Sequence, residues 1–374
     1  MCSIIGIVGK NFVAPELVES LRRMEYRGYD SVGVATLASG SNKIVLRKGI
    51  GKVSQVDGSL KLAQMEGSVG IGHTRWATHG GVTDYNAHPH SCCTGDIVVV
   101  HNGIIENYLP LKNELTAKDH RFRSETDTEV IAHLLEDYYN SNKNIKSAMV
   151  ETVKRLEGSY AFVAMFSDGT LACARLDEPL VIGVSENAYY ASSDVLGFLQ
   201  YTDQAVFLDN SDIAIILRNR LETLDFSGEP VSRNVTKVAW ELADANKGEF
   251  AHYTIKEIFE QRTSVKAATL QEERKVKLFC DAIEDAGNII VTGSGTSYHT
   301  SLILSMIGPR FLKKRFEAVM ASEFRYHMES VDNETAVIAI SQSGETADVL
   351  SATKLAKAAG AKILSIVNVP TSSL

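Results

Sequence analysis

Cys2 is the residue of this chain with the most evident chemistry. An initiator Met that precedes a side chain as small as cysteine is normally removed, and loss of Met1 leaves a thiol and a free α-amine on one residue. Such an amine has a pKa of about 7.7–8.0 and a thiol one of about 8.5, so the amine can take the thiol proton near neutral pH. Cys2 is therefore a candidate nucleophile that carries its own base. The alternative is an ordinary cysteine at a disordered terminus.

A second group of reactive side chains lies in residues 70–80, Gly-Ile-Gly-His-Thr-Arg-Trp-Ala-Thr-His-Gly. Arg75 can hold a carboxylate through two parallel hydrogen bonds. Trp76 can form a wall beside it, and Thr78 and His79 add hydrogen-bond donors. This pattern indicates a site for a small polar ligand. The alternative is that these residues form a surface loop in which the arginine has no binding role.

His101-Asn102-Gly103 follows the apolar run 96–100, which predicts a central strand. Asn-Gly after a strand most often marks a hairpin turn. The functional alternative is an oxyanion hole. In that case the Asn102 amide and the Gly103 N–H point at the oxygen that becomes negative when a thiolate attacks an amide.

Residues 124–129 predict the start of a helix, with Thr126 and Glu129 as a capping box. Asp127 lies in the predicted first turn. It could complement the helix dipole, or it could receive the ammonium group of a ligand.

Every second residue in one short segment is a possible metal ligand: His88, His90 and Cys92. In a strand, this spacing would place all three side chains on the same face. No CxxC or HxxxH spacing supports a metal site there, and a turn with ordinary polar side chains explains the pattern better. We therefore expect no metal and no cofactor.

The composition is that of an ordinary globular chain of 374 residues, with 44% hydrophobic and 22% charged residues, and its length predicts two or three domains. A net charge of −8 argues against a nucleic-acid partner. The sequence has no apolar run of membrane length and no leader, so we expect a cytoplasmic protein without a membrane partner. The five cysteines are expected to be thiols.

The order of the predicted elements divides the chain near residue 240. Residues 15–24 predict a helix, residues 4–8 a buried strand, and residues 159–228 one strand after another, which suggests a two-sheet sandwich with helices outside. From residue 288 onward strands alternate with helices, as in a parallel sheet. We expect a first domain over residues 1–240, a linker over 241–253 and a second domain over 254–374.

Two loops of the second domain each leave a predicted strand and open a helix. Such loops lie at the carboxyl edge of a parallel sheet, and helix N-termini attract anions. Hydroxyl groups without the lysine of a P-loop favour a monoester phosphate on a neutral body over a nucleotide, although plain helix caps remain the alternative. The candidate ligands are Thr296, Ser297, Ser341, Gln342, Ser343 and Thr346.

Taken together, these motifs resemble the glutamine–fructose-6-phosphate aminotransferase (isomerizing) family. The resemblance rests on Met1-Cys2 and on residues 25–31 (EYRGYDS), 73–80 (HTRWATHG), 86–90 (NAHPH), 98–107 (VVVHNGIIEN), 124–133 (SETDTEVIAH), 321–326 (ASEFRY), 341–348 (SQSGETAD) and 368–374. It implies a protein of the α/β class. An α+β N-terminal-nucleophile hydrolase domain with an α/β/β/α sandwich would precede part of a sugar-isomerase (SIS) domain with a parallel α/β sheet.

The resemblance also implies roles for the residues that match. Cys2 would be the nucleophile, Asn102 and Gly103 the oxyanion hole, and the six candidates in the second domain the ligands of the sugar phosphate. Glutamine would be bound by Arg75, Trp76, Thr78, His79 and Asp127. The substrates would be glutamine and fructose 6-phosphate, ammonia would pass between them inside the protein, and the protein would be a homodimer.

Three departures from the family pattern stand out. Ser3 replaces a usual glycine, Ser294 replaces a frequent cysteine, and the second SIS half, with its Glu, His and Lys, has no match up to Leu374. We therefore expect only the glutamine-hydrolysing half to be complete. The alternatives are a non-catalytic sugar-phosphate sensor and another cysteine-dependent amidotransferase, such as one that uses phosphoribosyl pyrophosphate.

Overall fold

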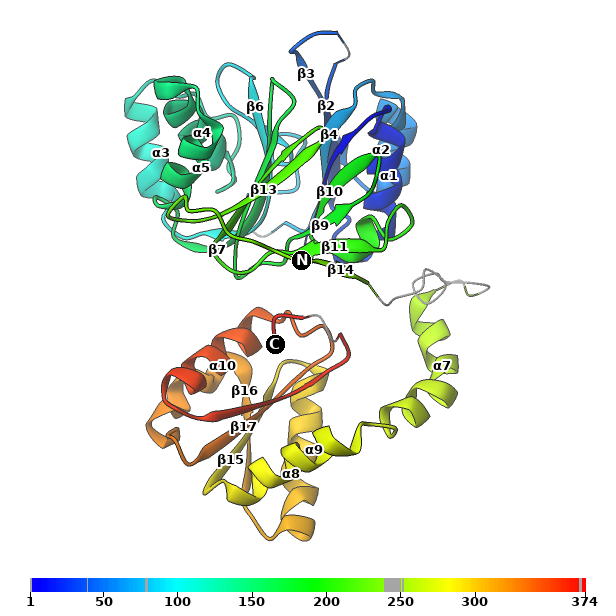
Figure 1. The fold of residues 1–374 in the computed structure, drawn as a ribbon, viewed down its shortest axis with the longest axis vertical. Helices are drawn as coiled ribbons and strands as arrows, with labels where there is room; N and C mark the ends of the chain where they lie inside the picture. The colour runs from blue at the N-terminus through cyan, green and yellow to red at the C-terminus, as the bar shows by residue number, and fades with distance from the viewer. Residues whose placement is uncertain (1, 39, 78–79, 239–249, 251, 370–371) are drawn as a thin grey trace. The chain divides into compact units, whose positions relative to one another are not determined.

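The computed structural model describes residues 2–38, 40–77, 80–238, 250, 252–369 and 372–374, and Figure 1 shows its fold. The chain forms two compact units, Met1–Asn246 and Lys247–Leu374. The predicted linker, residues 241–253, lies outside the described residues except at positions 250, 252 and 253. No helix in the described ranges is long and apolar enough to cross a membrane.

The first unit contains two antiparallel sheets. One has eight strands in the order β14-β11-β9-β10-β1-β4-β2-β3, and the other has six in the order β13-β12-β8-β7-β6-β5. Its elements are β1 (Ser3–Gly9), α1 (Ala14–Arg23), β2 (Ser31–Leu37), β3 (Ile44–Ile50), α2 (Val53–Leu60), β4 (Val69–Arg75), β5 (His90–Ser91), β6 (Ile97–Ile105), α3 (Tyr108–Ala117), α4 (Glu129–Asn142), α5 (Ile145–Val153), β7 (Gly158–Phe166), β8 (Leu171–Leu176), β9 (Val181–Val184), β10 (Ala188–Ser192), β11 (Gln204–Phe207), β12 (Asp212–Leu217), β13 (Arg220–Asp225) and β14 (Val235–Lys237).

Three hydrophobic cores hold this unit together as four layers. One core lies between the eight-stranded sheet and helices α1 and α2, one between the two sheets, and one between the six-stranded sheet and helices α3 to α5. Figure 1 shows the two helical layers on opposite outer sides of the paired sheets. The predicted α/β/β/α sandwich is therefore confirmed.

Strand β1 is central to this arrangement because both of its faces are buried. Ile5 and Ile7 pack toward α1, whereas Ile4 and Val8 pack between the sheets, as the two-residue period of a strand requires. Each such fully buried side chain contributes about 1.5–3 kcal/mol. The N-terminal segment is thus anchored, in agreement with the prediction of a buried strand over residues 4–8.

Strand β4 was not among the elements expected from the sequence. It lies, with β3 and α2, in the segment that follows β2. Within β4, Gly70 and Gly72 face α1, and a Cβ at either position would approach a leucine methyl of that helix within 3.0 Å. The glycines therefore let α1 pack closely on the sheet, and the interpretation of the arginine segment as a surface loop is wrong for Arg75, which ends the strand.

Strand β6 corrects the expectation for the Asn-Gly pair. The strand continues through Asn102 and Gly103 to Ile105 and pairs with β7 in unbroken register, Gly103 opposite Tyr160. The predicted end of the strand, and with it the hairpin alternative, is therefore wrong. Glycine is needed because the residue has a φ of +103° and lies against the β7 backbone.

Helix α4 also begins later than predicted. Its first residue is Glu129, so the capping box of Thr126 and Glu129 does not form. The Glu129 carboxylate instead accepts hydrogen bonds from the backbone N–H groups of Arg123 and Ser124. Asp127 therefore lies in the segment before the helix and not in its first turn.

The second unit has a four-stranded sheet in the order β16-β15-β17-β18, in which all pairs are parallel. Helix α10 and the 3₁₀ helix η4 pack on one face, and α8 and α9 on the other. This arrangement confirms the predicted parallel sheet. The elements are α7 (Tyr253–Ala268), α8 (Glu273–Asp285), β15 (Asn288–Gly293), α9 (Thr296–Leu312), β16 (Phe316–Met320), η4 (Ala321–Ser330), β17 (Thr335–Ser341), α10 (Ala347–Ala358) and β18 (Lys362–Val367).

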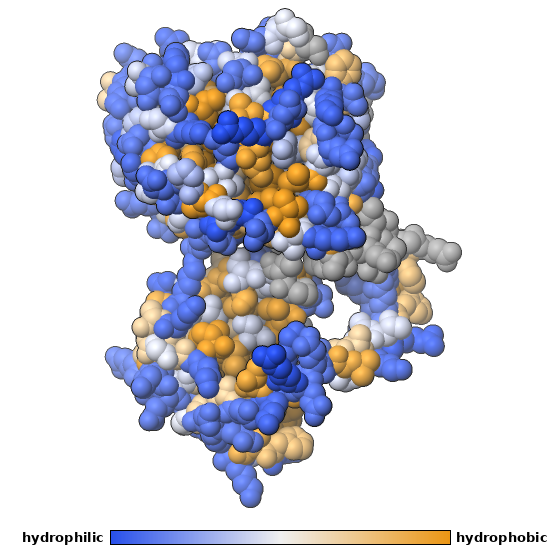
Figure 2. All heavy atoms as spheres, viewed as in Figure 1, coloured by the Kyte–Doolittle hydropathy of each residue, from blue (hydrophilic) through white to orange (hydrophobic). Residues whose placement is uncertain are grey.

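Apolar side chains also reach the surface, as Figure 2 shows for one face of the molecule. In the second unit several of them belong to α9, where Ile303, Met306 and Phe311 are more than half exposed.

The fit between β6 and β7 yields a stability prediction. A Cβ at Gly103 would lie 2.0 Å from the carbonyl oxygen of Ser159. Because Gly103→Ala needs both an unfavourable φ and a local separation of the two strands, we expect it to lower the free energy of unfolding by about 3 kcal/mol or more. Chemical denaturation measures this change.

Gly95→Ala is the matched control, because Gly95 also has a positive φ, +80°, but no described atom within 4 Å of an added Cβ. It should cost only about 1 kcal/mol. Equal losses for the two variants would contradict the steric explanation.

Candidate active site

Cys2 lies beside the end of β4. The backbone N–H of Trp76 donates to the Cys2 Sγ over 3.2 Å, and the thiol lies 3.5 Å from the Trp76 carbonyl oxygen. This contact follows from the pairing of β1 with β4, in which Ser3 is opposite Thr74. Burial raises the pKa of the Cys2 thiol, and Arg75 opposes this shift through its positive charge.

Asn102 lies on the other side of Cys2. Its Nδ2 donates to the Cys2 carbonyl oxygen over 3.1 Å, while its Oδ1 lies 3.1 Å from the buried His73 Nε2. Burial lowers the pKa of His73 to about 3, so this imidazole is neutral at physiological pH and can donate to the amide oxygen. The Asn102 amide is therefore oriented with its nitrogen toward the nucleophile.

Arg75 is buried and shares this region. Its guanidinium donates to the carbonyl oxygens of Gly81 (3.2 Å) and Gly80 (3.4 Å). Burial lowers its pKa, while the nearby Cys2 and Asp127 raise it. The structure thus brings the arginine within electrostatic reach of both the thiol and the carboxylate.

Asp127 is buried as well, and its Oδ2 accepts a hydrogen bond of 2.8 Å from the N–H of Ile105. The two charged groups expected to hold the two ends of an amino acid are therefore in one region. Trp76 is partly exposed, and its ring meets the edge of Tyr29 at a centroid distance of 5.4 Å. Thr78 and His79 lie outside the described residues.

Three residues that position the site were not singled out from the sequence, although two of them lie in the quoted 25–31 motif. Arg27 Nε donates to the Cys2 carbonyl oxygen over 3.2 Å, and its Nη1 lies 3.3 Å from Asp194 Oδ2. Asp30 accepts a hydrogen bond from the N–H of Ala77, which holds the chain after Arg75. A charged pair separated by more than 160 positions has no local sequence signal, so Asp194 was not predictable.

Ser3, the first departure from the family pattern, is accommodated without strain on the site. Its side chain is fully buried, and its hydroxyl donates to the carbonyl oxygen of Met24 over 2.9 Å. The side chain thus points away from the thiol of the preceding residue and ties β1 to the end of α1.

His88 and His90 do not converge with Cys92. The Nε2 atoms of the two imidazoles lie 3.3 Å from Thr128 Oγ1 and 3.1 Å from Thr126 Oγ1, respectively, so both rings support the segment that carries Asp127. The Cys92 thiol instead lies 3.4 Å from the hydroxyl of Thr94.

The six phosphate candidates lie at one edge of the second unit's sheet. Strands β15 and β17 are parallel neighbours, with Gly293 opposite Ile340, so the two loops leave the sheet side by side. Ser341 Oγ lies 3.1 Å from Thr346 Oγ1 and accepts from the N–H of Gly344. Thr296 and Gln342 are exposed, while Ser297 and Ser343 are half-buried.

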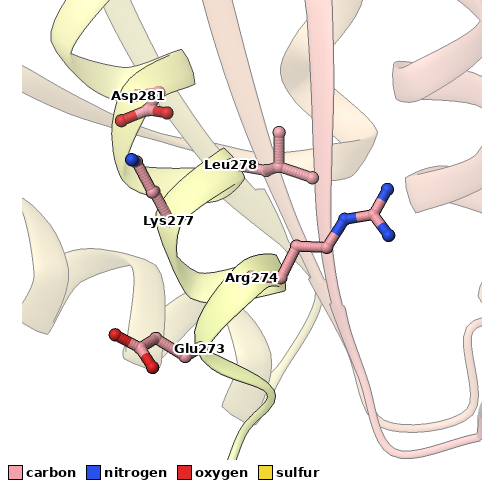
Figure 3. Close-up of a pocket in the computed structure, with 5 residues that line it drawn as sticks. All are labelled: Glu273, Arg274, Lys277, Leu278 and Asp281. Atoms are coloured by element: carbon pink, nitrogen blue, oxygen red, sulfur yellow. The ribbon is translucent and has the colours of Figure 1, made fainter.

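A surface hollow elsewhere in this unit is not part of either group. It is lined by five residues of α8, and Figure 3 shows their side chains pointing in different directions. They do not converge on a ligand position. These residues are Glu273, Arg274, Lys277, Leu278 and Asp281.

Comparisons with known proteins agree with this architecture. Residues 73–200 match the family model of the glutamine amidotransferase domain, and residues 282–374 match that of the SIS domain. The solved structure of glutamine phosphoribosylpyrophosphate amidotransferase from B. subtilis aligns with a TM-score of 0.54 over 99% of this chain and 82% of that one. At 20% identity it supports the fold alone.

Two curated relatives cover essentially the whole chain. The glutamine--fructose-6-phosphate aminotransferase [isomerizing] of Pyrococcus horikoshii is 44% identical over 373 residues, 99% of this chain and 62% of the relative. That of Aquifex aeolicus is 40% identical over 379 residues, 100% of this chain and 63% of the relative. The chain thus spans a little over three fifths of the length of these relatives, and over that span it is similar to the glutamine--fructose-6-phosphate aminotransferases.

Proposed function

We propose that this chain is the glutamine-hydrolysing part, with a first sugar-phosphate-binding unit, of an enzyme that makes glucosamine 6-phosphate from glutamine and fructose 6-phosphate. One observation carries the proposal. The Cys2 thiol lies 3.2 Å from the Trp76 N–H while the Asn102 amide holds the carbonyl oxygen of the same residue. A nucleophile and a candidate oxyanion donor are therefore adjacent.

Hydrolysis would begin after removal of Met1. The Cys2 α-amine takes the thiol proton, directly or through a water, and the sulfur attacks the carboxamide carbon of glutamine. The carbonyl oxygen becomes negative and is stabilised by the Asn102 amide, which has two hydrogens and donates only one of them to Cys2. Gly103 would supply the second donor.

Collapse of this intermediate breaks the C–N bond. The proton taken from the thiol goes to the leaving group, and ammonia departs from a γ-glutamyl thioester. Water then attacks the thioester, with the α-amine again as base, and releases glutamate and the thiol.

Selection of glutamine would depend on its charged ends. Arg75 would bind the α-carboxylate with help from Thr78 and His79, and Asp127 would bind the ammonium group. The opposite charges of Arg75 and Asp127, which already act on each other across this region, fit such a zwitterion. Trp76 would line the site and the path of the ammonia.

The second unit would hold the phosphate of the sugar. Two hydroxyl-rich loops at neighbouring parallel strands, each opening a helix, offer N–H and O–H donors to one anion. Opening and isomerisation of the sugar would use residues of the portion of the relatives that this chain does not span. A homodimer and a cytoplasmic location remain predictions from the sequence.

Two other functions deserve a test. A sugar-phosphate sensor with the same fold would have no reactive Cys2. An amidotransferase that uses phosphoribosyl pyrophosphate would need an acidic diphosphate-binding segment, and residues 341–346 contain one acidic residue, Glu345. Intact mass and a glutaminase assay, with and without fructose 6-phosphate, separate these cases.

The identity of the nucleophile is tested with an electrophilic glutamine analogue. We expect one label per chain, on Cys2 of a protein that has lost Met1, and a loss of glutaminase activity of at least about 10³-fold in Cys2→Ser. Cys280→Ser, at an exposed cysteine of the second unit, is the control and should behave like the parent. Labelling that persists in Cys2→Ser would overturn the assignment.

The proposed role of the Cys2 α-amine as the base predicts how the kcat/KM for glutamine depends on pH. Because burial raises the pKa of the thiol, Cys2 is protonated at pH 7 and depends on the neutral α-amine, which is populated above about pH 7.7–8.0. The kcat/KM for glutamine should therefore rise about tenfold per pH unit from pH 6 and level off near pH 8.5. A flat profile between pH 6 and 9 would argue against the α-amine.

The binding role of Asp127 predicts a substrate-specific defect. Asp127→Asn removes a negative charge from the ammonium position and should raise the KM for glutamine about 10–100-fold. Asp84→Asn is a matched control, because Asp84 also accepts one backbone hydrogen bond, from Ile50, but is exposed. Similar KM values for the two variants would refute the role of Asp127.

A further inference from the structure

Four side chains of the first unit converge at a place that the proposed reaction does not use. Cys93 follows β5, His120 follows α3, and His133 and Glu136 lie three positions apart on α4, so that both face the same side of the helix. The donor atoms of all four lie within 4.8 Å of one another. His133 and Glu136 are buried, His120 is half-buried, and Cys93 is at the surface.

The distances between these atoms are short and similar. The Nδ1 atoms of His120 and His133 are 3.1 Å apart, and each lies 3.7 Å from the Cys93 Sγ. Glu136 Oε2 is 3.2 Å from the first Nδ1 and 3.6 Å from the second. A tetrahedral zinc ion with Zn–N near 2.0–2.1 Å and Zn–S near 2.3 Å separates its ligand atoms by about 3.3–3.7 Å.

The surroundings orient these groups toward one centre. The opposite nitrogen of His120, Nε2, lies 2.7 Å from Asp137 Oδ1, which fixes the proton on Nε2 and leaves the Nδ1 lone pair directed inward. His133 Nε2 lies 3.6 Å from Glu129 Oε1, which is beyond hydrogen-bond distance but places a carboxylate on the outer side of this imidazole as well. A carboxylate behind each imidazole is the usual support of a histidine that binds a metal.

The remaining two groups have comparable support. The N–H of Arg121 donates to the Cys93 Sγ over 3.3 Å, as backbone amides do to metal-bound thiolates. Glu136 accepts from the N–H groups of Cys93 (3.0 Å) and Thr94 (2.8 Å). The two Nδ1 atoms, the Cys93 sulfur and the Glu136 carboxylate can each offer an electron pair to one cation placed between them.

We propose that Cys93, His120, His133 and Glu136 bind one zinc ion. A thiolate, two imidazoles and a carboxylate within 4.8 Å of one another form a ligand set that suits zinc, and hard cations such as Mg²⁺ or Ca²⁺ would prefer six or more oxygens. With four protein ligands the site is closed, so its role is structural.

The site connects three segments that are distant in sequence. Through His133 it reaches Glu129, whose Oε2 accepts from both the N–H (2.7 Å) and the hydroxyl (2.6 Å) of Ser124. Ser124 opens the short segment that contains Asp127. The ion would therefore stiffen the support of a residue assigned to glutamine, although zinc binding itself does not depend on the proposed function.

The first experiment measures metal in the untagged chain, purified without chelator. We expect about one zinc per chain, a lower midpoint of thermal unfolding after removal with a chelator, and recovery on addition of Zn²⁺. A chain that is isolated free of metal and takes up neither Zn²⁺ nor Co²⁺ in titrations would overturn the proposal. In that case the four groups form only a hydrogen-bonded cluster.

The ligand set is tested with Co²⁺ in place of zinc. The parent should show the intense visible absorption of tetrahedral cobalt and a thiolate-to-cobalt charge-transfer band in the near ultraviolet. Cys93→Ser, which exchanges one atom at an exposed position, should lose that band and bind at least about tenfold more weakly. Asp137→Asn should weaken binding about 10–100-fold but keep the band.

Cys280→Ser is the control and should match the parent in both affinity and spectrum, because its thiol lies in the other unit. An unchanged charge-transfer band in Cys93→Ser would place the metal elsewhere and reject this site.

Discussion

The antiparallel pairing of β1 with β4 is the constraint on which the rest of the structure depends. With Ser3 opposite Thr74, the residue before β1 meets the residues after β4, and the Trp76 N–H reaches the thiol of Cys2. A shift by one residue would exchange the two faces of β1 and move its isoleucines out of their separate cores. The same apolar contacts that hold the sheet therefore also fix the chemistry of the N-terminus.

Much of this architecture could be predicted because it has a local origin. The succession of strands in the first unit and the change to a strand–helix pattern after residue 288 correctly indicated the two-sheet sandwich and the parallel sheet. The individual candidates Cys2, Arg75, Asn102 and Asp127 were chosen for their side-chain chemistry, and the fold gathers them around one place. Their roles in glutamine hydrolysis remain proposals that the variants will decide.

Other features depend on contacts between distant segments, and the sequence does not show them. Gly103 suggested a turn, yet the strand continues through it, and glycine is needed there because β7 approaches too closely for any side chain. Glu129 suggested an N-cap two positions too early, at Thr126 and not at Thr128, because its carboxylate instead binds the loop before the helix. The neighbours His88, His90 and Cys92 drew attention to a metal, whereas the convergent set uses Cys93 and three residues from two other segments.

Two adjacent residues of β6 join layers that are otherwise separate. His101 points to the helical side, where its Nδ1 lies 2.9 Å from the hydroxyl of Thr128 just before α4, and Asn102 points between the sheets, where it holds Cys2. The N-terminal end of α4 and the nucleophile are thus linked through one peptide unit of β6 and one hydrogen bond on each side of it. A substitution that displaces Thr128 would therefore also alter the support of Cys2.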